Sequence, residues 1–205
     1  MEATTLLITL PLILLLSFTT NGVSARHGFS IVDEPPAVLD TNRDKLLEGK
    51  YYYLVPVIGL SHTAVIIPGV YRNDTCWFDL RNIETNFYPI TGLPVKFSPV
   101  VPNNDSSISE STDLIIRFSD ELASACGGSS VLKAKWFLFL GASGDETSKF
   151  KIEKVFSPIH RNFCYKLVYS SGQVVGTSTR PDGTVRLALA SDHPLLFWFH
   201  PSGNT

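Results

Sequence analysis

Lys149-Phe150-Lys151-Ile152-Glu153-Lys154-Val155 alternates between charged and apolar side chains for most of its length. Successive side chains of a β-strand point to opposite faces, so this stretch predicts a strand with one wet and one dry face. Similar short runs recur along the chain, separated by residues that favour turns. The predicted strands cover residues 51–58, 63–70, 76–83, 93–101, 113–118, 133–140, 149–156, 163–169, 184–190 and 195–199.

The segments between these runs are rich in Pro, Gly, Asn and Ser, as in Gly127-Gly128 and Pro181-Asp182-Gly183. No stretch keeps a 3.6-residue apolar period for long enough to form a substantial helix. The longest polar stretch, residues 103–112, predicts an exposed loop. About a dozen short strands in one chain predict an all-β barrel, sandwich or trefoil.

Composition limits the class of protein further. The chain has 205 residues, of which 44% are hydrophobic, and this is enough for one well-buried domain. Charged residues make up only 18%, which excludes a disordered polyelectrolyte. The 17 Lys and Arg are balanced by 19 Asp and Glu, for a net charge of −2, which argues against a nucleic-acid partner.

Residues 6–18 form an almost uninterrupted apolar run that is followed by Val23-Ser24-Ala25. The run is shorter than the roughly 20 residues of a membrane-spanning helix. Small residues after such a run are typical of a signal peptidase site. We therefore predict a secretory signal peptide at residues 1–25, a mature domain at 26–205, and no membrane span in the mature chain.

Export affects how the cysteines and asparagines are interpreted. In an oxidising compartment two of Cys76, Cys126 and Cys164 could pair, and spacing alone permits three pairings. Without a C-x-x-C motif or a Cys/His cluster, a metal site is not expected. Two sequons, at Asn73 and Asn104, predict glycosylation on exposed loops.

Several motifs together resemble the plant Kunitz inhibitors of the soybean trypsin inhibitor type. They occur in the family's order and span roughly residues 35–200, which is nearly all of the predicted mature chain. The motifs are Val38-Leu39-Asp40-Thr41, Tyr52-Tyr53-Leu54-Val55-Pro56, Lys135-Trp136, Phe150-Lys151-Ile152-Glu153-Lys154-Val155, Tyr165-Lys166-Leu167-Val168-Tyr169, Asp182-Gly183-Thr184 and Pro194-Leu195-Leu196-Phe197-Trp198-Phe199.

This resemblance implies a β-trefoil of about 12 strands, in which a six-stranded barrel is capped by three hairpins with pseudo-threefold symmetry. It also implies a monomer, delivered outside the cell or to the vacuole, that needs no cofactor. In this family Cys76 and Cys126 would form the disulfide that encloses the protease-binding loop. Cys164 would then be an unpaired, partly buried thiol.

The same resemblance places the protease-binding loop at Ser98-Pro99-Val100-Val101-Pro102, with Val101 at P1 and Pro102 at P1′. Trypsin requires Lys or Arg at P1, so a protease with a small apolar pocket is the better expected target. A register one residue earlier, Val100-Val101, avoids a proline at P1′, which lacks an N–H. Glu48 stands where the family has an Asn that braces the loop, and a glycan on Asn104 would lie beside the contact surface.

Catalysis is not expected, since the five His show no metal-ligand spacing and no G-x-S-x-G motif occurs. Trp136 and Trp198 lie in apolar runs and are interpreted as core residues. Two hypotheses remain. One is an endopeptidase inhibitor, directed at a serine protease or, through another loop, at a papain-like cysteine protease. The other is a non-inhibitory trefoil that binds a protein, a carbohydrate or a small hydrophobic ligand.

Overall fold

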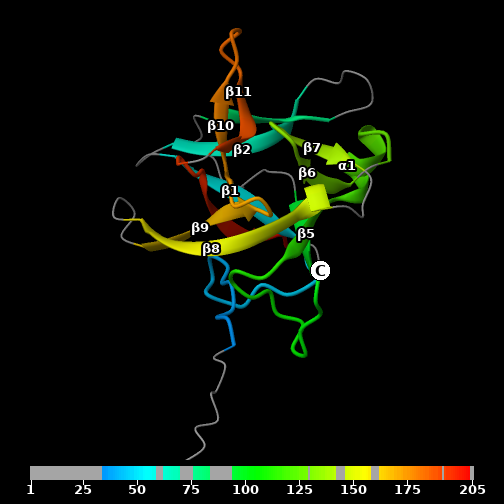
Figure 1. Ribbon diagram of the computed structural model, residues 1–205, viewed down its shortest axis with the longest axis vertical. Coiled ribbons are helices and arrows are strands. Elements are labelled where there is room, and N and C mark those ends of the chain that lie inside the picture. Colours follow the sequence, from blue (N-terminus) through cyan, green and yellow to red (C-terminus); the bar gives the residue numbers. More distant parts are fainter. Residues whose placement is uncertain are drawn as a thin grey trace, which may run out of the picture. The chain divides into compact units, whose positions relative to one another are not determined.

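Six strands close into a barrel in which each strand pairs antiparallel with two neighbours (Figure 1). Around the ring they are β1 (Tyr52–Ile58), β4 (Pro94–Pro99), β5 (Leu114–Phe118), β8 (Lys149–Ser157), β9 (Asn162–Tyr169) and β12 (Leu196–Pro201). The ring is complete because β12 pairs with both β9 and β1. A closed barrel has no free strand edge, so its backbone donors and acceptors are paired internally.

The other six strands form three hairpins that cap the barrel. These are β2 (His62–Pro68) with β3 (Phe78–Ile83), β6 (Val131–Ala134) with β7 (Leu138–Gly141), and β10 (Val174–Thr179) with β11 (Val185–Ala190). The hairpins also contact one another in pairs, through Val185 with Leu80, Trp77 with Phe139, and Phe137 with Ala188. This repeated arrangement of strands β1–β4, β5–β8 and β9–β12 is a β-trefoil, as predicted.

Aromatic side chains fill the centre of the molecule. The largest fully buried side chains include Phe78, Phe97, Phe150, Phe197 and Phe199. Phe78 stacks on Phe118 with ring centroids 4.5 Å apart, and Phe97 meets Phe199 edge to face at 5.4 Å. Burying one such ring stabilises the fold by about 1.5–3 kcal/mol, so these rings are a main source of the stability of the trefoil.

The computed structural model describes residues 34–58, 62–69, 76–83, 94–128, 130–141, 146–157, 162–190 and 192–203. All of them except Glu34 belong to one compact unit, Pro35–Thr205. The predicted signal peptide at residues 1–25 and the sequon at Asn73 lie outside these residues. No helix in the described part of the chain is both long enough and apolar enough to cross a membrane.

Most predicted strands are present, with three differences. The run at 133–140 is two strands, β6 and β7, and strand β10 was not predicted. One short helix, α1 (Asp120–Ala125), and a 3-10 turn, Glu146–Ser148, interrupt the strands.

The interpretation of Trp136 as a core residue is wrong, because it lies in the turn between β6 and β7 and is 81% exposed. Its neighbour Phe137 instead contacts the adjacent hairpin.

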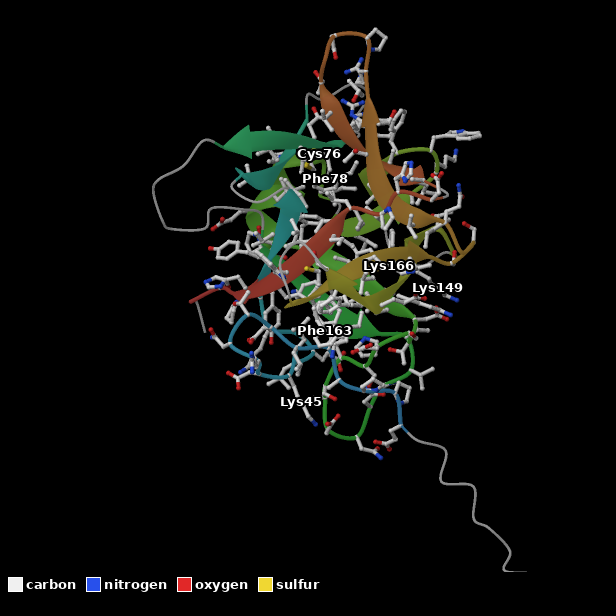
Figure 2. The ribbon with its side chains drawn as sticks, turned by 90° about the vertical axis from the view of Figure 1, so that its left-hand side faces the viewer. Lys45, Cys76, Phe78, Lys149, Phe163 and Lys166 are labelled. Atoms are coloured by element: carbon white, nitrogen blue, oxygen red, sulfur yellow. A yellow bond between two sulfur atoms is a disulfide. The ribbon has the colours of Figure 1, made fainter. Side chains whose placement is uncertain are left out.

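Cys76 and Cys126 are joined by a disulfide, the pair that the family resemblance implied, with their Cα atoms 5.6 Å apart. The bond links Cys76, which is labelled in Figure 2 and precedes Trp77 and β3, to Cys126 at the end of α1. Cys164 is a free thiol, and it is fully rather than partly buried. Burial raises the pKa of the Cys164 thiol, so this cysteine is not activated as a nucleophile.

Candidate functional site

The predicted protease-binding loop leaves the barrel at the end of β4. Phe97 is fully buried, and Ser98 and Pro99 are half-buried and still pair with β5. The Val100 N–H donates to the Asp113 carbonyl at 2.9 Å, which extends the pairing by one residue. The base of the loop is therefore anchored to the barrel on both sides.

The loop reaches its most exposed point immediately after this anchor. Val100 is 40% exposed and Val101 is 75% exposed, and Pro102 is exposed as well. A large apolar side chain exposed to water does not contribute the free energy that its burial would supply. Its presence at a loop tip therefore indicates an interaction site. Val101 is the more exposed of the two valines at this point of the loop.

The segment after Pro102 is tied down by its own side chains. The Asn103 side-chain amide donates to the Ser107 carbonyl at 2.8 Å and to Ser109 Oγ at 3.1 Å. Asp105 Oδ1 accepts hydrogen bonds from Ser107 N–H at 3.1 Å and from Ser107 Oγ at 2.7 Å. Ser106, between them, has a φ of 55°, a left-handed backbone conformation that the surrounding bonds must hold.

The N-terminal segment before β1 supports the loop from outside, and the two chain segments lie side by side in Figure 1. Isolated β-bridges join Leu47 to Ser107 and Ala37 to Ser109. The Glu48 N–H donates to the Ser106 carbonyl at 2.8 Å, while the Glu48 side chain is exposed. Glu48 thus supports the loop through its backbone, and the side-chain brace comes from Asn103 within the loop.

An ion pair adds to this support. Lys45 Nζ lies 3.1 Å from Asp105 Oδ2. The hydrogen bonds from Ser107, followed by the contact with Lys45, lower the pKa of Asp105 to about 2. Both partners are largely exposed, so the pair fixes geometry more than it adds stability.

The far end of the loop is buried, which corrects the prediction that all of residues 103–112 are exposed. Ser107, Ile108 and Glu110 are buried. Ile108 bonds through its backbone to Val38 at 2.8 Å and to Leu46 at 2.9 Å. Burial raises the pKa of the Glu110 carboxyl, whose Oε1 has no hydrogen-bond partner among the residues that the structure describes. Ile108, an apolar residue in a polar stretch, thus anchors the far end of the loop to the core.

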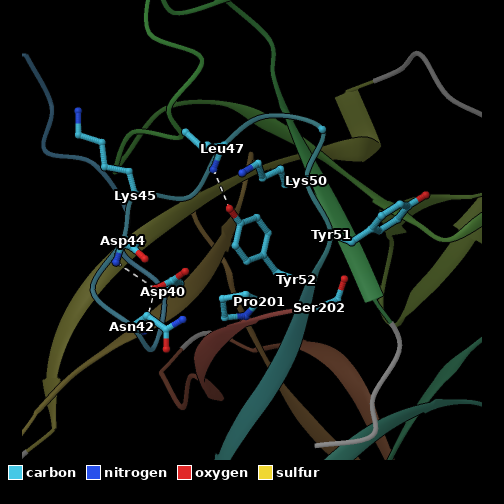
Figure 3. Close-up of a pocket in the computed structure, with 11 residues that line it drawn as sticks. Asp40, Asn42, Asp44, Lys45, Leu47, Lys50, Tyr51, Tyr52, Pro201 and Ser202 are labelled. Atoms are coloured by element: carbon cyan, nitrogen blue, oxygen red, sulfur yellow. Dashed lines mark hydrogen bonds between the residues drawn. The ribbon is translucent and has the colours of Figure 1, made fainter. Parts of the chain in front are cut away.

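Figure 3 shows how the N-terminal segment holds its own shape. Asp40 Oδ1 accepts hydrogen bonds from the Asn42 N–H at 2.8 Å and the Asp44 N–H at 3.0 Å, while the Leu47 N–H donates to the Tyr52 hydroxyl at 3.0 Å. A hollow of about 750 Å³ lies between this segment and the chain end at Pro201 and Ser202. These bonds fix the turn from which Lys45 extends.

Two further features concern modification and metals. Asn104 and Ser106 are both exposed, so the second sequon is accessible. Across the part of the chain that the structure describes, no group of three or more His, Cys, Asp or Glu could hold a metal ion.

The fold and the site together define a β-trefoil protein whose β4–β5 connection presents an exposed peptide on a braced base. Residues 38–200 match the family model of the legume Kunitz proteins, described as trypsin and protease inhibitor. The chain therefore belongs to the plant Kunitz, or soybean trypsin inhibitor, family. This is a family of non-enzymatic inhibitors, which agrees with the prediction from sequence.

Known relatives place the chain within this family. It is 33% identical over 175 residues to Kunitz trypsin inhibitor 5 of Arabidopsis thaliana, covering 79% of this chain and 84% of that protein. It is 31% identical over 193 residues to miraculin of Synsepalum dulcificum, covering 81% of this chain and 83% of that protein. A Kunitz-type cysteine protease inhibitor from potato has the same fold, with a TM-score of 0.63 and 20% identity over 83% of this chain and all of its own (100%).

Proposed function

We propose that this protein is a secreted inhibitor of endopeptidases that presents Val101 as its P1 residue and does not act on trypsin. The supporting observation is that Val101 is 75% exposed on a loop anchored at both ends. Such a loop enters a protease cleft as a substrate would, and little conformational entropy is lost because its shape is already fixed.

The chemistry of Val101 selects the target class. A branched three-carbon side chain cannot reach the acid at the base of a trypsin pocket. It fits the small apolar pocket of an elastase-like serine protease. Pro102 at P1′ has no N–H to offer the enzyme and resists the geometry of peptide cleavage. We therefore expect slow or no cleavage of the loop in the complex.

Secretion and glycosylation are part of the same proposal. Residues 1–25 act as the signal peptide, and the mature inhibitor is a monomer that functions outside the cell or in the vacuole. Asn104 carries a glycan three residues from Val101, which narrows the range of proteases that can approach the loop.

A second candidate target is a papain-like cysteine protease bound through the turn between β6 and β7. The supporting observation is Trp136, which is 81% exposed. Its turn is held by two backbone hydrogen bonds, from Leu189 N–H to the Trp136 carbonyl at 3.0 Å and from Lys135 N–H to the Phe137 carbonyl at 3.3 Å. An exposed tryptophan on a turn whose backbone is held in this way is a typical anchor in protein interfaces.

The test is a titration of the secreted, glycosylated protein against trypsin, chymotrypsin, pancreatic elastase, subtilisin and papain. Stoichiometric inhibition of elastase that is lost in Val101→Asp supports the main proposal. Inhibition of papain that is lost in Trp136→Ala supports the second candidate. If none of the five enzymes is inhibited, before or after removal of the glycans, both the main proposal and the second candidate are contradicted. That result favours a trefoil with another binding function.

A further inference from the structure

The hairpin of β8 and β9 carries an apolar surface that protease inhibition does not use. Ile152 and Leu167 pair across this hairpin and are buried in the core. Alternate residues of a strand share a face, so the core-facing side continues through the pairs Lys154 with Tyr165 and Phe156 with Phe163. The barrel covers this face only as far as Tyr165.

Past Tyr165 the two phenylalanine rings are open to solvent. Phe156 is 57% exposed and Phe163 is 50% exposed, although their rings meet edge to face at 5.7 Å. Such a pair is found inside proteins or at binding sites more often than on a free surface. Phe163 lies on the side of the molecule that Figure 2 turns toward the reader.

These rings line a hollow of about 620 Å³ between the hairpin and the N-terminal turn that contains Arg43. Its volume falls in the range of about 300–1,000 Å³ that is usual for small-molecule sites. Trp198 and Tyr165 add aromatic lining, so flat rings face the hollow from several strands. This lining suits a planar aromatic group better than a flexible chain.

The charges around the hollow are unequal. Lys154 Nζ lies 4.3 Å from the centre of the Phe163 ring, and the exposed Arg43 also lines the hollow. Among the described residues that line the hollow, Asp40 is the one carboxylate, and its Oδ1 already accepts two backbone N–H groups. The Glu110 carboxyl interacts with Lys154 but does not line the hollow. The described lining itself carries two cations and one engaged carboxylate, an arrangement complementary to an anion.

We propose that this hollow is a binding site for a small aromatic carboxylate. The aromatic ring packs against Phe156 and Phe163, and the carboxylate accepts hydrogen bonds from Lys154 and Arg43. The site is separate from the loop that presents Val101, so it stands or falls independently of protease inhibition.

The test is isothermal titration of the mature protein with 2-naphthoate and with its neutral analogue 2-naphthylmethanol. We expect 1:1 binding of the acid, weakened about tenfold in the double variant Arg43→Gln/Lys154→Gln, with binding of the alcohol unchanged. Phe163→Ser should weaken both ligands. Because all three side chains are exposed, these variants should fold, and circular dichroism checks that they do.

Lys151→Gln is the matched control, because it removes the same charge from the opposite face of β8. It should leave the affinity for 2-naphthoate unchanged. The proposal is overturned if neither ligand binds saturably, if acid and alcohol bind equally well, or if Lys151→Gln weakens the acid as much as the double variant does.

Discussion

The β4–β5 loop and the β8–β9 hairpin occupy related positions, since each joins one strand set of the trefoil to the next. They differ in what holds them. The loop is fixed by side chains and by the N-terminal segment, and its exposed apolar point is Val101. The hairpin is fixed by eight cross-strand residue pairs and exposes two aromatic rings, Phe156 and Phe163.

The difference shows that the barrel core sets where a connection begins and ends but not what it displays. A loop held by polar contacts can present a peptide of fixed shape, because its hydrogen bonds restrict the backbone. Each such bond contributes a net stabilisation of only about 0.5–1.5 kcal/mol. A long hairpin can extend a core-facing surface beyond the core. One scaffold therefore carries a peptide-presenting region and an aromatic hollow.

The largest effect is expected from converting the loop to a trypsin ligand. In Val101→Arg/Pro102→Ile, an arginine reaches the acid of the trypsin pocket and P1′ regains its N–H. Trypsin affinity, measured by competitive titration in protein without glycans, should rise by about a thousandfold. Binding of 2-naphthoate to the β8–β9 hollow should not change. An unchanged trypsin affinity would mean that Val101 is not at P1.

A change at the disulfide should affect the scaffold beneath both regions. Cys76 and Cys126 enclose a loop with a sequence separation of 50, and a crosslink of this length stabilises a fold by roughly 4 kcal/mol in the chain-entropy model. Cys76→Ala/Cys126→Ala should lose about this much free energy of unfolding in urea titrations. Cys164→Ala, at a buried free thiol, should lose about 1 kcal/mol. Equal losses of unfolding free energy in the double variant and in Cys164→Ala would argue against the Cys76–Cys126 disulfide.

A smaller effect should distinguish the β4–β5 loop from the β8–β9 hollow. Asn103→Ala removes the two hydrogen bonds that brace the loop from within. We expect elastase inhibition to weaken about tenfold while naphthoate binding is retained. The matched control is Asn104→Ala in unglycosylated protein, because Asn104 is exposed and precedes the Asp105 brace. If the control weakens inhibition as much as Asn103→Ala, the internal brace is not what fixes the loop.

The smallest effect is a pH dependence confined to the loop. The pKa of Asp105 is lowered to about 2 from its ordinary 3.8, so folding favours the ionised form. Its contribution is present above pH 4 and is lost as the pH falls from about 4 to about 2. The protection of the Ser107 amide against exchange, relative to its intrinsic rate at each pH, should therefore fall over this range in the wild-type protein. In Asp105→Asn the protection of the Ser107 amide should already be low at neutral pH and should show no such step.

Glu110 is an internal contrast of opposite sign. Burial raises the pKa of its carboxyl, so the folded state favours the protonated form, and stability falls as the pH rises through the folded pKa. Glu110→Gln should remove this dependence while leaving the Asp105 step intact. A Ser107 exchange profile that changes in Glu110→Gln would mean that the two carboxyls are coupled.

Much of the fold could be predicted from sequence, because alternation and turn residues are local signals. The strand at 149–156 is an example, since each buried side chain is flanked by polar neighbours. Strand β10 was missed because Gly176 and three small polar residues interrupt its apolar pattern. The run at 133–140 was not divided, because Lys135-Trp136-Phe137 contains no Gly or Pro to mark the turn.

The candidate site was predictable only in part. The motif order assigned Val101 to P1, and in the structure Val101 is 75% exposed. The brace by Asn103 could not be predicted, since it depends on the return path of the loop past Ser107 and Ser109. The hollow at Phe156 was also missed, because alternation predicts a face but not where the barrel stops covering it. Whether Val101 contacts a protease stays a prediction.

The most direct measurement is an active-site titration of pancreatic elastase with the secreted protein and with Val101→Asp. We expect the wild-type protein to inhibit at a 1:1 ratio, and the aspartate variant, which places a charge in an apolar pocket, to inhibit at least about a hundredfold more weakly. Inhibition that is equally strong in Val101→Asp, or no inhibition by the wild-type protein with its glycans removed, would contradict the assignment of Val101 as the residue that enters the protease.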